Sequence, residues 1–292
     1  MKFEGIMPAL VTPLNEDETI NVKVLKELID YQLGLGADGF YVGGATGEGL
    51  ALRTEERMIL AEESVKAING RKPCIFQVAA TDFHDAIALA KYAEKVGADA
   101  ISATPPLFFG YNEQNVYDYY KALADSVHIP LMIYYNMNAG FTINADFAAR
   151  MFEVDNITAI KWTSPNYYEM IKLKDKTNGE MNIINGPDEM LLMGLNAGAD
   201  GGIGTTYNVQ LKNIKAVYEN FKAGNIAEAQ RMQTLADRII SVIIKYKAIP
   251  GTKALLREMG FDVGAPTFPM TNYTPEQRKQ ILSEAIAAGL EF

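Results

Sequence analysis

The sequence predicts an α/β protein: a (β/α)8 TIM barrel followed by a C-terminal helical extension. Eight short apolar segments alternate with amphipathic segments over roughly the first 220 residues, close to the typical size of such a barrel. The apolar segments are near-continuous runs of Val, Ile, Ala and Met, as in parallel strands that are covered by helices. A Gly-Ala-Asp repeat at residues 36–38, 97–99 and 198–200 separates a helix from a strand each time.

The predicted strands are the eight apolar runs, at residues 5–11, 38–43, 74–79, 99–103, 130–135, 157–161, 181–185 and 199–203. Apolar residues recur at three- and four-residue steps, the spacing of an amphipathic helix, at residues 21–35, 54–68, 84–96, 113–126 and 144–152. The pattern leaves one alternative, an open doubly wound sheet, because both folds alternate strands with helices.

Helices without intervening strands follow, at residues 211–221, 226–245, 252–259 and 275–288. We therefore expect a barrel catalytic domain at residues 1–220 and a helical extension, packed on the barrel, at residues 221–292. In a barrel of this kind the chemistry lies at the C-terminal ends of the strands and in the loops after them, so those positions hold the candidate residues.

Composition excludes several classes of function. The 292 residues include 36 acidic and 27 basic side chains, a net charge of −9, and no basic cluster that would bind nucleic acid. Cys74 is the single cysteine, and His84 and His128 stand apart, so we expect neither disulfides nor a metal site. Because no export signal and no long apolar segment is present, we expect a cytoplasmic protein without membrane contact.

Lys161 is the candidate nucleophile. It lies at the end of the sixth predicted strand and is followed by Trp162 and Thr163, which give it a partly apolar setting. Burial disfavours the charged form of a lysine, and the neutral amine can attack a carbonyl carbon to form a Schiff base. The alternative, commoner for a lysine taken alone, is a solvated side chain at a strand end.

The turn at residues 43–49 is a candidate anion site. Its four glycines let backbone N–H groups face a ligand, and the Thr46 hydroxyl adds a donor. The turn has neither the Gly-Lys-Ser/Thr ending of a P-loop nor a G-x-G-x-x-G fingerprint, so a small carboxylate is the better-sized ligand. The alternative is a glycine-rich connection without a ligand.

Hydroxyl and acidic side chains lie at or after the ends of three other strands. Of Tyr134 and Tyr135, alternation along the strand turns one phenol toward the barrel axis, where it could move protons near the lysine. Asp188 and Glu189 after the seventh strand and Thr205 after the eighth could hydrogen-bond a polyhydroxylated substrate. The alternatives are packing for the tyrosines and helix capping for the acids.

These segments, in this order, resemble the N-acetylneuraminate lyase and dihydrodipicolinate synthase family of class I (Schiff-base) aldolases. The resemblance covers nearly the whole chain, and its specific parts are the strand-five tyrosine and residues 9–13, 41–48, 160–163, 186–189 and 198–208. The last two stretches are similar to the N-acetylneuraminate lyase branch. Residues 137–140 lack the arginine with which the dihydrodipicolinate synthase branch binds a second carboxylate, which disfavours that branch.

The resemblance implies a role for each candidate residue. Lys161 would form the imine with a 2-oxo acid, whose carboxylate would lie against Thr46 and the neighbouring backbone at Ala45. Thr163 would contact the substrate chain near the cleaved bond. The resemblance also implies substrate-binding roles for Gly186, Asp188, Glu189 and Thr205. The last three would bind the hydroxyls of the sugar chain.

The same resemblance indicates which tyrosine would carry the proton. The family's tyrosine lies four residues after the strand's proline, which is Pro130 here, and so corresponds to Tyr134. Tyr135 fits the family's Tyr-Asn pair and stays the alternative, although it would require an extra residue inside the strand.

The chain departs from the family pattern at several positions. Ala45 stands where the family has Ser or Thr, and Phe108 stands where a tyrosine often reaches across a subunit contact. A proton relay through those two hydroxyls therefore cannot operate. Asn138 replaces the usual proline, and Trp162 is unusual, so we expect a reshaped pocket.

The resulting hypothesis is a homotetrameric lyase that cleaves a hydroxylated 2-oxo acid, best N-acetylneuraminate, to pyruvate and an aldehyde without a cofactor. A related pyruvate-dependent aldolase or dehydratase, acting on another sugar acid or an aldehyde adduct, is the first alternative. Dihydrodipicolinate synthase is a less favoured one. A non-enzymatic sensor that binds a 2-oxo acid reversibly is the alternative from a different class.

Overall fold

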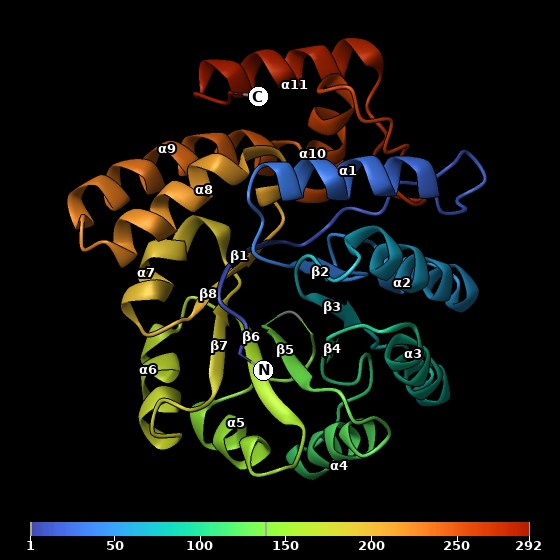
Figure 1. Ribbon diagram of the computed structural model, residues 1–292, viewed down its shortest axis with the longest axis vertical. Helices are drawn as coiled ribbons and strands as arrows, with labels where there is room; N and C mark the ends of the chain where they lie inside the picture. The colour runs from blue at the N-terminus through green and yellow to red at the C-terminus, as the bar shows by residue number, and fades with distance from the viewer. Residues whose placement is uncertain (1, 138, 292) are drawn as a thin grey trace.

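A computed structural model describes residues 2–137 and 139–291 of the chain. Its centre is one sheet of eight parallel strands surrounded by helices (Figure 1). The strands are β1 (Gly5–Pro8), β2 (Phe40–Val42), β3 (Cys74–Gln77), β4 (Ala100–Ala103), β5 (Leu131–Asn136), β6 (Ile157–Thr163), β7 (Asn182–Asn185) and β8 (Gly201–Gly204).

The strand order shows that the sheet closes on itself. From β2 to β8 each strand pairs with the next one in sequence, and β1 pairs with β8. The remaining seam is joined by a parallel bridge between Ala9 and Tyr41, with the Leu10 N–H donating to the Tyr41 carbonyl over 2.9 Å. The predicted barrel is therefore confirmed. The open doubly wound sheet is wrong, because its strand order would reverse at a switch point.

Eight helices follow the strands and cover the outside of the barrel (Figure 1). They are α1 (Val22–Gly34), α2 (Thr54–Ile68), α3 (Phe83–Val96), α4 (Glu113–Ala124), α5 (Ala145–Phe152), α6 (Tyr167–Lys176), α7 (Leu191–Asn196) and α8 (Tyr207–Lys222). Five begin at an Asn or Asp whose side chain accepts from a first-turn N–H: Asn21, Asp82, Asn112, Asn144 and Asn166. Periodicity did not predict α6 and α7, because α6 buries only Met170 and Leu173 and α7 has six residues.

The apolar core has two layers separated by the barrel wall. Side chains at alternate strand positions fill the interior, including Met7, Ile75, Met132 and Ile203. The other strand positions point outward and pack against the helices in the larger cluster. This alternation decides which side chains can reach the mouth of the barrel.

Three further helices follow the barrel: α9 (Ile226–Lys245), α10 (Ala248–Glu258) and α11 (Pro275–Ala287). Figure 1 shows them stacked over α8 and α1 at one side of the barrel. The sequence placed the start of α10 at residue 252, but Pro250 lies in the first turn of the helix, where a missing N–H costs little. The division of the chain at residue 220 stays a prediction. Among the helices described, none combines the length and apolar character that a membrane crossing requires.

A buried ion pair joins the extension to the turn after β2. Lys253 Nζ on α10 lies 2.5 Å from Glu48 Oε1, and both side chains are essentially excluded from solvent. Glu48 Oε2 also accepts from the Thr267 N–H over 2.6 Å, and Lys253 donates to the Ala265 carbonyl over 3.0 Å. Burial lowers the pKa of Lys253, while the charge of Glu48 opposes that shift. The C-terminal extension thus holds the glycine-rich turn in place.

We expect Lys253→Met to lower the free energy of unfolding by about 3–5 kcal/mol, because it leaves the Glu48 carboxylate buried without a counterion. Urea denaturation measures the loss. The double variant Glu48→Gln, Lys253→Met leaves no buried charge at the site and should recover most of the stability. A double variant as unstable as Lys253→Met would contradict this account.

Candidate active site

Lys161 lies on β6 with its side chain inside the barrel. The residue is 5% exposed, and its Nζ lies 4.4 Å from the ring centre of Tyr134 and 4.6 Å from that of Tyr41. Both rings lie within the distance range of cation–π contacts. Within the described ranges no carboxylate forms an ion pair with Lys161, so the amine can meet an entering carbonyl carbon without first leaving a counterion.

The two neighbouring tyrosines of β5 face opposite sides of the wall. Tyr134 belongs to the interior cluster, pairs in register with Lys161, and accepts from Asn136 Nδ2 over 3.4 Å. Tyr135 belongs to the outer cluster, where its ring makes an edge contact with Trp162 at 4.9 Å. The expectation that Trp162 shapes the pocket is wrong, because β6 continues through Thr163 and turns Trp162 outward.

The glycine-rich turn has a backbone geometry that requires its glycines. Gly43 has a φ of +69°, and a Cβ on Gly49 would lie 1.9 Å from the Gly43 carbonyl oxygen, so only glycine fits there. Thr46 is buried, and its Oγ1 lies 2.7 Å from Oγ1 of Thr205. This contact joins the turn after β2 to the loop after β8.

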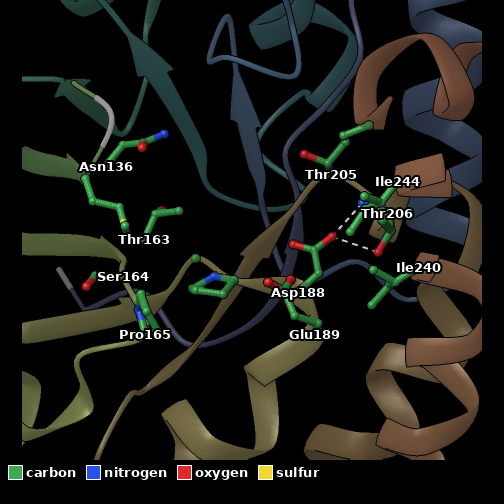
Figure 2. A pocket seen from close by; sticks show the side chains of 14 residues that line it. Asn136, Thr163, Ser164, Pro165, Asp188, Glu189, Thr205, Thr206, Ile240 and Ile244 are labelled. Atoms are coloured by element: carbon green, nitrogen blue, oxygen red, sulfur yellow. Dashed lines mark hydrogen bonds between the residues drawn. The ribbon is translucent and has the colours of Figure 1, made fainter. Parts of the chain in front are cut away.

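One open pocket of about 300 Å³ brings together the side chains expected to bind a sugar chain. Figure 2 shows Asp188 and Thr205 on one side and Thr163 across from them. Asn136, Ser164, Thr206, Ile240 and Ile244 also line it. Five of the expected substrate-binding residues line this pocket: Thr163, Gly186, Asp188, Glu189 and Thr205.

Asp188 is held in one orientation at the edge of this pocket. Its Oδ2 accepts from both the N–H and the hydroxyl of Thr206 at 2.7 Å, as the dashed lines in Figure 2 show. Among the described residues nothing donates to Oδ1, which leaves that oxygen for a ligand hydroxyl. Burial raises the pKa of Asp188 to about 6, although the Thr206 hydrogen bonds and the charge of Lys161 oppose the shift.

Thr163 and Gly186 face each other across neighbouring strand ends. A Cβ on Gly186 would lie 2.0 Å from Thr163 Oγ1, so only glycine allows that hydroxyl its position. Thr163 Oγ1 is enclosed without a hydrogen-bond partner among the described residues. Such a hydroxyl gains a partner when a polar ligand enters the pocket.

Several residues of the site escaped the sequence analysis. Tyr41 is turned inward by alternation on β2, which its strand position could have indicated. Ile240 and Ile244 reach the pocket from α9, and only the tertiary packing of the extension brings them there. Asn136 lines the pocket at the end of β5, whereas Asn138 lies outside the described residues.

Two other expectations concern the loops and metals. Phe108 is 91% exposed in the loop after β4, so it contributes nothing to the pocket within this chain. In the part of the chain that the structure covers, no cluster of His, Cys, Asp or Glu could hold a metal ion.

Known proteins are similar to this chain in both sequence and fold. The chain is 37% identical to an N-acetylneuraminate lyase of Rhizobium meliloti (strain 1021), over 100% of this chain and 97% of the relative. The Proteus mirabilis N-acetylneuraminate lyase superposes with a TM-score of 0.95 at 29% identity and covers 100% of both chains. A Bacillus anthracis dihydrodipicolinate synthase gives a TM-score of 0.93 at 27% identity, covering 98% of this chain and 99% of its own.

The family profile agrees with these relatives. The Dihydrodipicolinate synthetase family matches residues 2–288, nearly the entire length. The resemblance drawn from the sequence motifs is therefore confirmed. Together with the barrel and the inward lysine at its mouth, the match shows that the chain belongs to the dihydrodipicolinate synthetase family.

Proposed function

We propose that this protein is a Schiff-base lyase that cleaves N-acetylneuraminate to pyruvate and an amino-sugar aldehyde. The observation that carries the proposal is the enclosed amine of Lys161, which lies against Tyr134 beside a pocket of acids and hydroxyls. The relatives named N-acetylneuraminate lyase, at 31–37% identity, support the choice of substrate.

The proposed reaction begins with a covalent bond. Lys161 Nζ attacks the C2 carbonyl, water leaves, and a protonated imine forms. The electron pair of the C3–C4 bond then moves into the imine and gives an enamine. The C4 hydroxyl gives its proton to Tyr134, the phenol proton passes to the substrate carboxylate, and the aldehyde departs. Protonation of the enamine at C3 and hydrolysis release pyruvate and the free lysine. General acid–base groups typically contribute about 10² to 10⁴ in rate.

The other candidate residues bind the substrate in this proposal. Thr46 and the backbone N–H groups at Ala45 and Thr46 hold the carboxylate, since such turns favour anions. Thr163 contacts the chain near the broken bond. The hydroxylated tail lies along Gly186, Asp188, Glu189 and Thr205.

A second candidate keeps the imine and changes the substrate to another sugar acid or an aldehyde adduct. The observation that favours it is Ala45, which lines the cavity beside Tyr134 without a hydroxyl. Dihydrodipicolinate synthase is less favoured, because residues 137, 139 and 140 offer no arginine for a second carboxylate. A sensor without catalysis is the non-enzymatic alternative.

Borohydride reduction in the presence of pyruvate should trap a covalent adduct on Lys161, because only the imine is reduced onto the protein. Intact mass and peptide mapping detect it, and Lys161→Arg should abolish it. Turnover of N-acetylneuraminate within a panel of 2-oxo acids completes the test. An adduct without turnover of any acid would support the sensor, and turnover of another acid alone would support the second candidate.

Tyr134→Phe should lower kcat by about 10² to 10⁴ while leaving pyruvate trapping in place, because the imine still forms but the C4 proton has no acceptor. Tyr135→Phe is the matched control, since it removes the same hydroxyl on the outer side of the wall. Its kcat should stay within about twofold of the wild type. The reverse ranking would make Tyr135 the proton carrier.

We also propose a cytoplasmic homotetramer. The family resemblance suggests it, and adjacent Phe108 and Phe109, 91% and 63% exposed, are the kind of apolar patch that an interface covers. Sedimentation velocity should show a tetramer, and Phe108→Ser with Phe109→Ser should shift it to smaller species. Phe268→Ser is the control, because Phe268 is also exposed, at 87%. A wild-type monomer would contradict the assembly. Cell fractionation tests the location.

A further inference from the structure

A second pocket lies beside Tyr134, away from the acids of the first. It measures about 170 Å³ and has apolar walls from Leu50, Leu107 and Ala139. Tyr134 and Asn136 also line it, and Asn136 lines the first pocket as well. A substrate held at Tyr134 therefore faces two cavities of different character, one acidic and one largely apolar.

A buried arginine orients the amide that faces the second pocket. Arg57 on α2 is enclosed and donates to the carbonyls of Ala79 and Gln77 and to Gln77 Oε1, at 2.8–2.9 Å. A guanidinium only donates, so the oxygen of the Gln77 amide must face Arg57 and the nitrogen must face away. Within the described residues nothing accepts from Gln77 Nε2, and Gln77 lines the pocket. The amide N–H groups are thus directed to an occupant.

A second polar group in the pocket has no partner. Thr104 Oγ1 is enclosed and makes no hydrogen bond to a described residue. Thr104 directly follows β4, whose Ala103 pairs with Ile133, so Thr104 is level with Tyr134 on the next strand. Because Thr104 lines the pocket, its hydroxyl is placed to form a hydrogen bond with an occupant. The pocket therefore offers two N–H donors and one hydroxyl between apolar walls.

These features fit a small amide that carries a methyl group, and we infer that the second pocket binds the acetamido branch of the substrate. The inference rests on the proposed function. With the C4 hydroxyl at Tyr134, the neighbouring C5 carries two substituents that diverge, the hydroxylated chain and the acetamido group. The hydroxylated chain of the substrate suits the acidic side chains of the first pocket. The acetamido carbonyl accepts from Gln77, its N–H meets Thr104, and its methyl packs against the leucines.

The test compares two substrates that differ only at C5, N-acetylneuraminate and the analogue with a hydroxyl in place of the acetamido group. Gln77→Leu should lower kcat/KM for N-acetylneuraminate about tenfold, the cost of one lost hydrogen bond, and change the analogue by no more than about twofold. Ala139→Leu, which fills the pocket from its wall, should give the same selectivity. Glu189→Gln is the contrast and should lower kcat/KM for both substrates alike, because both carry the hydroxylated chain.

Pyruvate trapping on each variant shows that the imine site is intact. A selective loss in Gln77→Leu or Ala139→Leu supports the assignment. Equal losses on both substrates, or no loss in either variant, overturn it and leave the lyase proposal standing. Turnover of neither compound by the wild-type protein overturns the lyase proposal, and this inference with it.

Discussion

Closure of the eight-stranded sheet is the constraint on which the rest of the structure depends. Once β1 meets β2 through the bridge of Ala9 and Tyr41, every strand has one face inside and one outside. A side chain on the inner face is then enclosed unless it lies at a mouth of the barrel. Lys161 lies at the mouth, because it is two residues before the end of β6. The same parity places Tyr134 beside it and sends Tyr135 and Trp162 to the outer core.

The C-terminal extension completes the mouth of the barrel. The ion pair of Glu48 and Lys253 fixes the turn after β2, and Ile240 and Ile244 form one wall of the first pocket. A buried ion pair contributes little net stability compared with apolar packing, but its geometry admits few alternatives. We therefore interpret the pair as a device that positions the turn, at the cost of desolvating two charges.

The two cavities at the mouth differ in chemistry because different loops build them. The loops after β7 and β8 supply acids and hydroxyls, with Asp188 held by Thr206. The other cavity is lined by the turn after β2 and the loop after β4, where Ala45 and Leu107 present apolar surface. The inferred placement of the hydroxylated arm in one cavity and the acetamido arm in the other follows this division.

The sequence by itself determined the eight strands, most helices and the identity of the side chains at the strand ends, because periodicity and glycine placement are local properties of the chain. Local pattern alone did not separate Tyr134 from Tyr135, because a shift of one residue reverses every side chain, and the sequence favoured Tyr134 only through the spacing of the family resemblance. Tertiary structure decided which of the two phenols faces the interior of the barrel. It also decided the partners of Glu48, Gln77 and Ile240, because those contacts join segments far apart in the chain and depend on how the extension and helices pack.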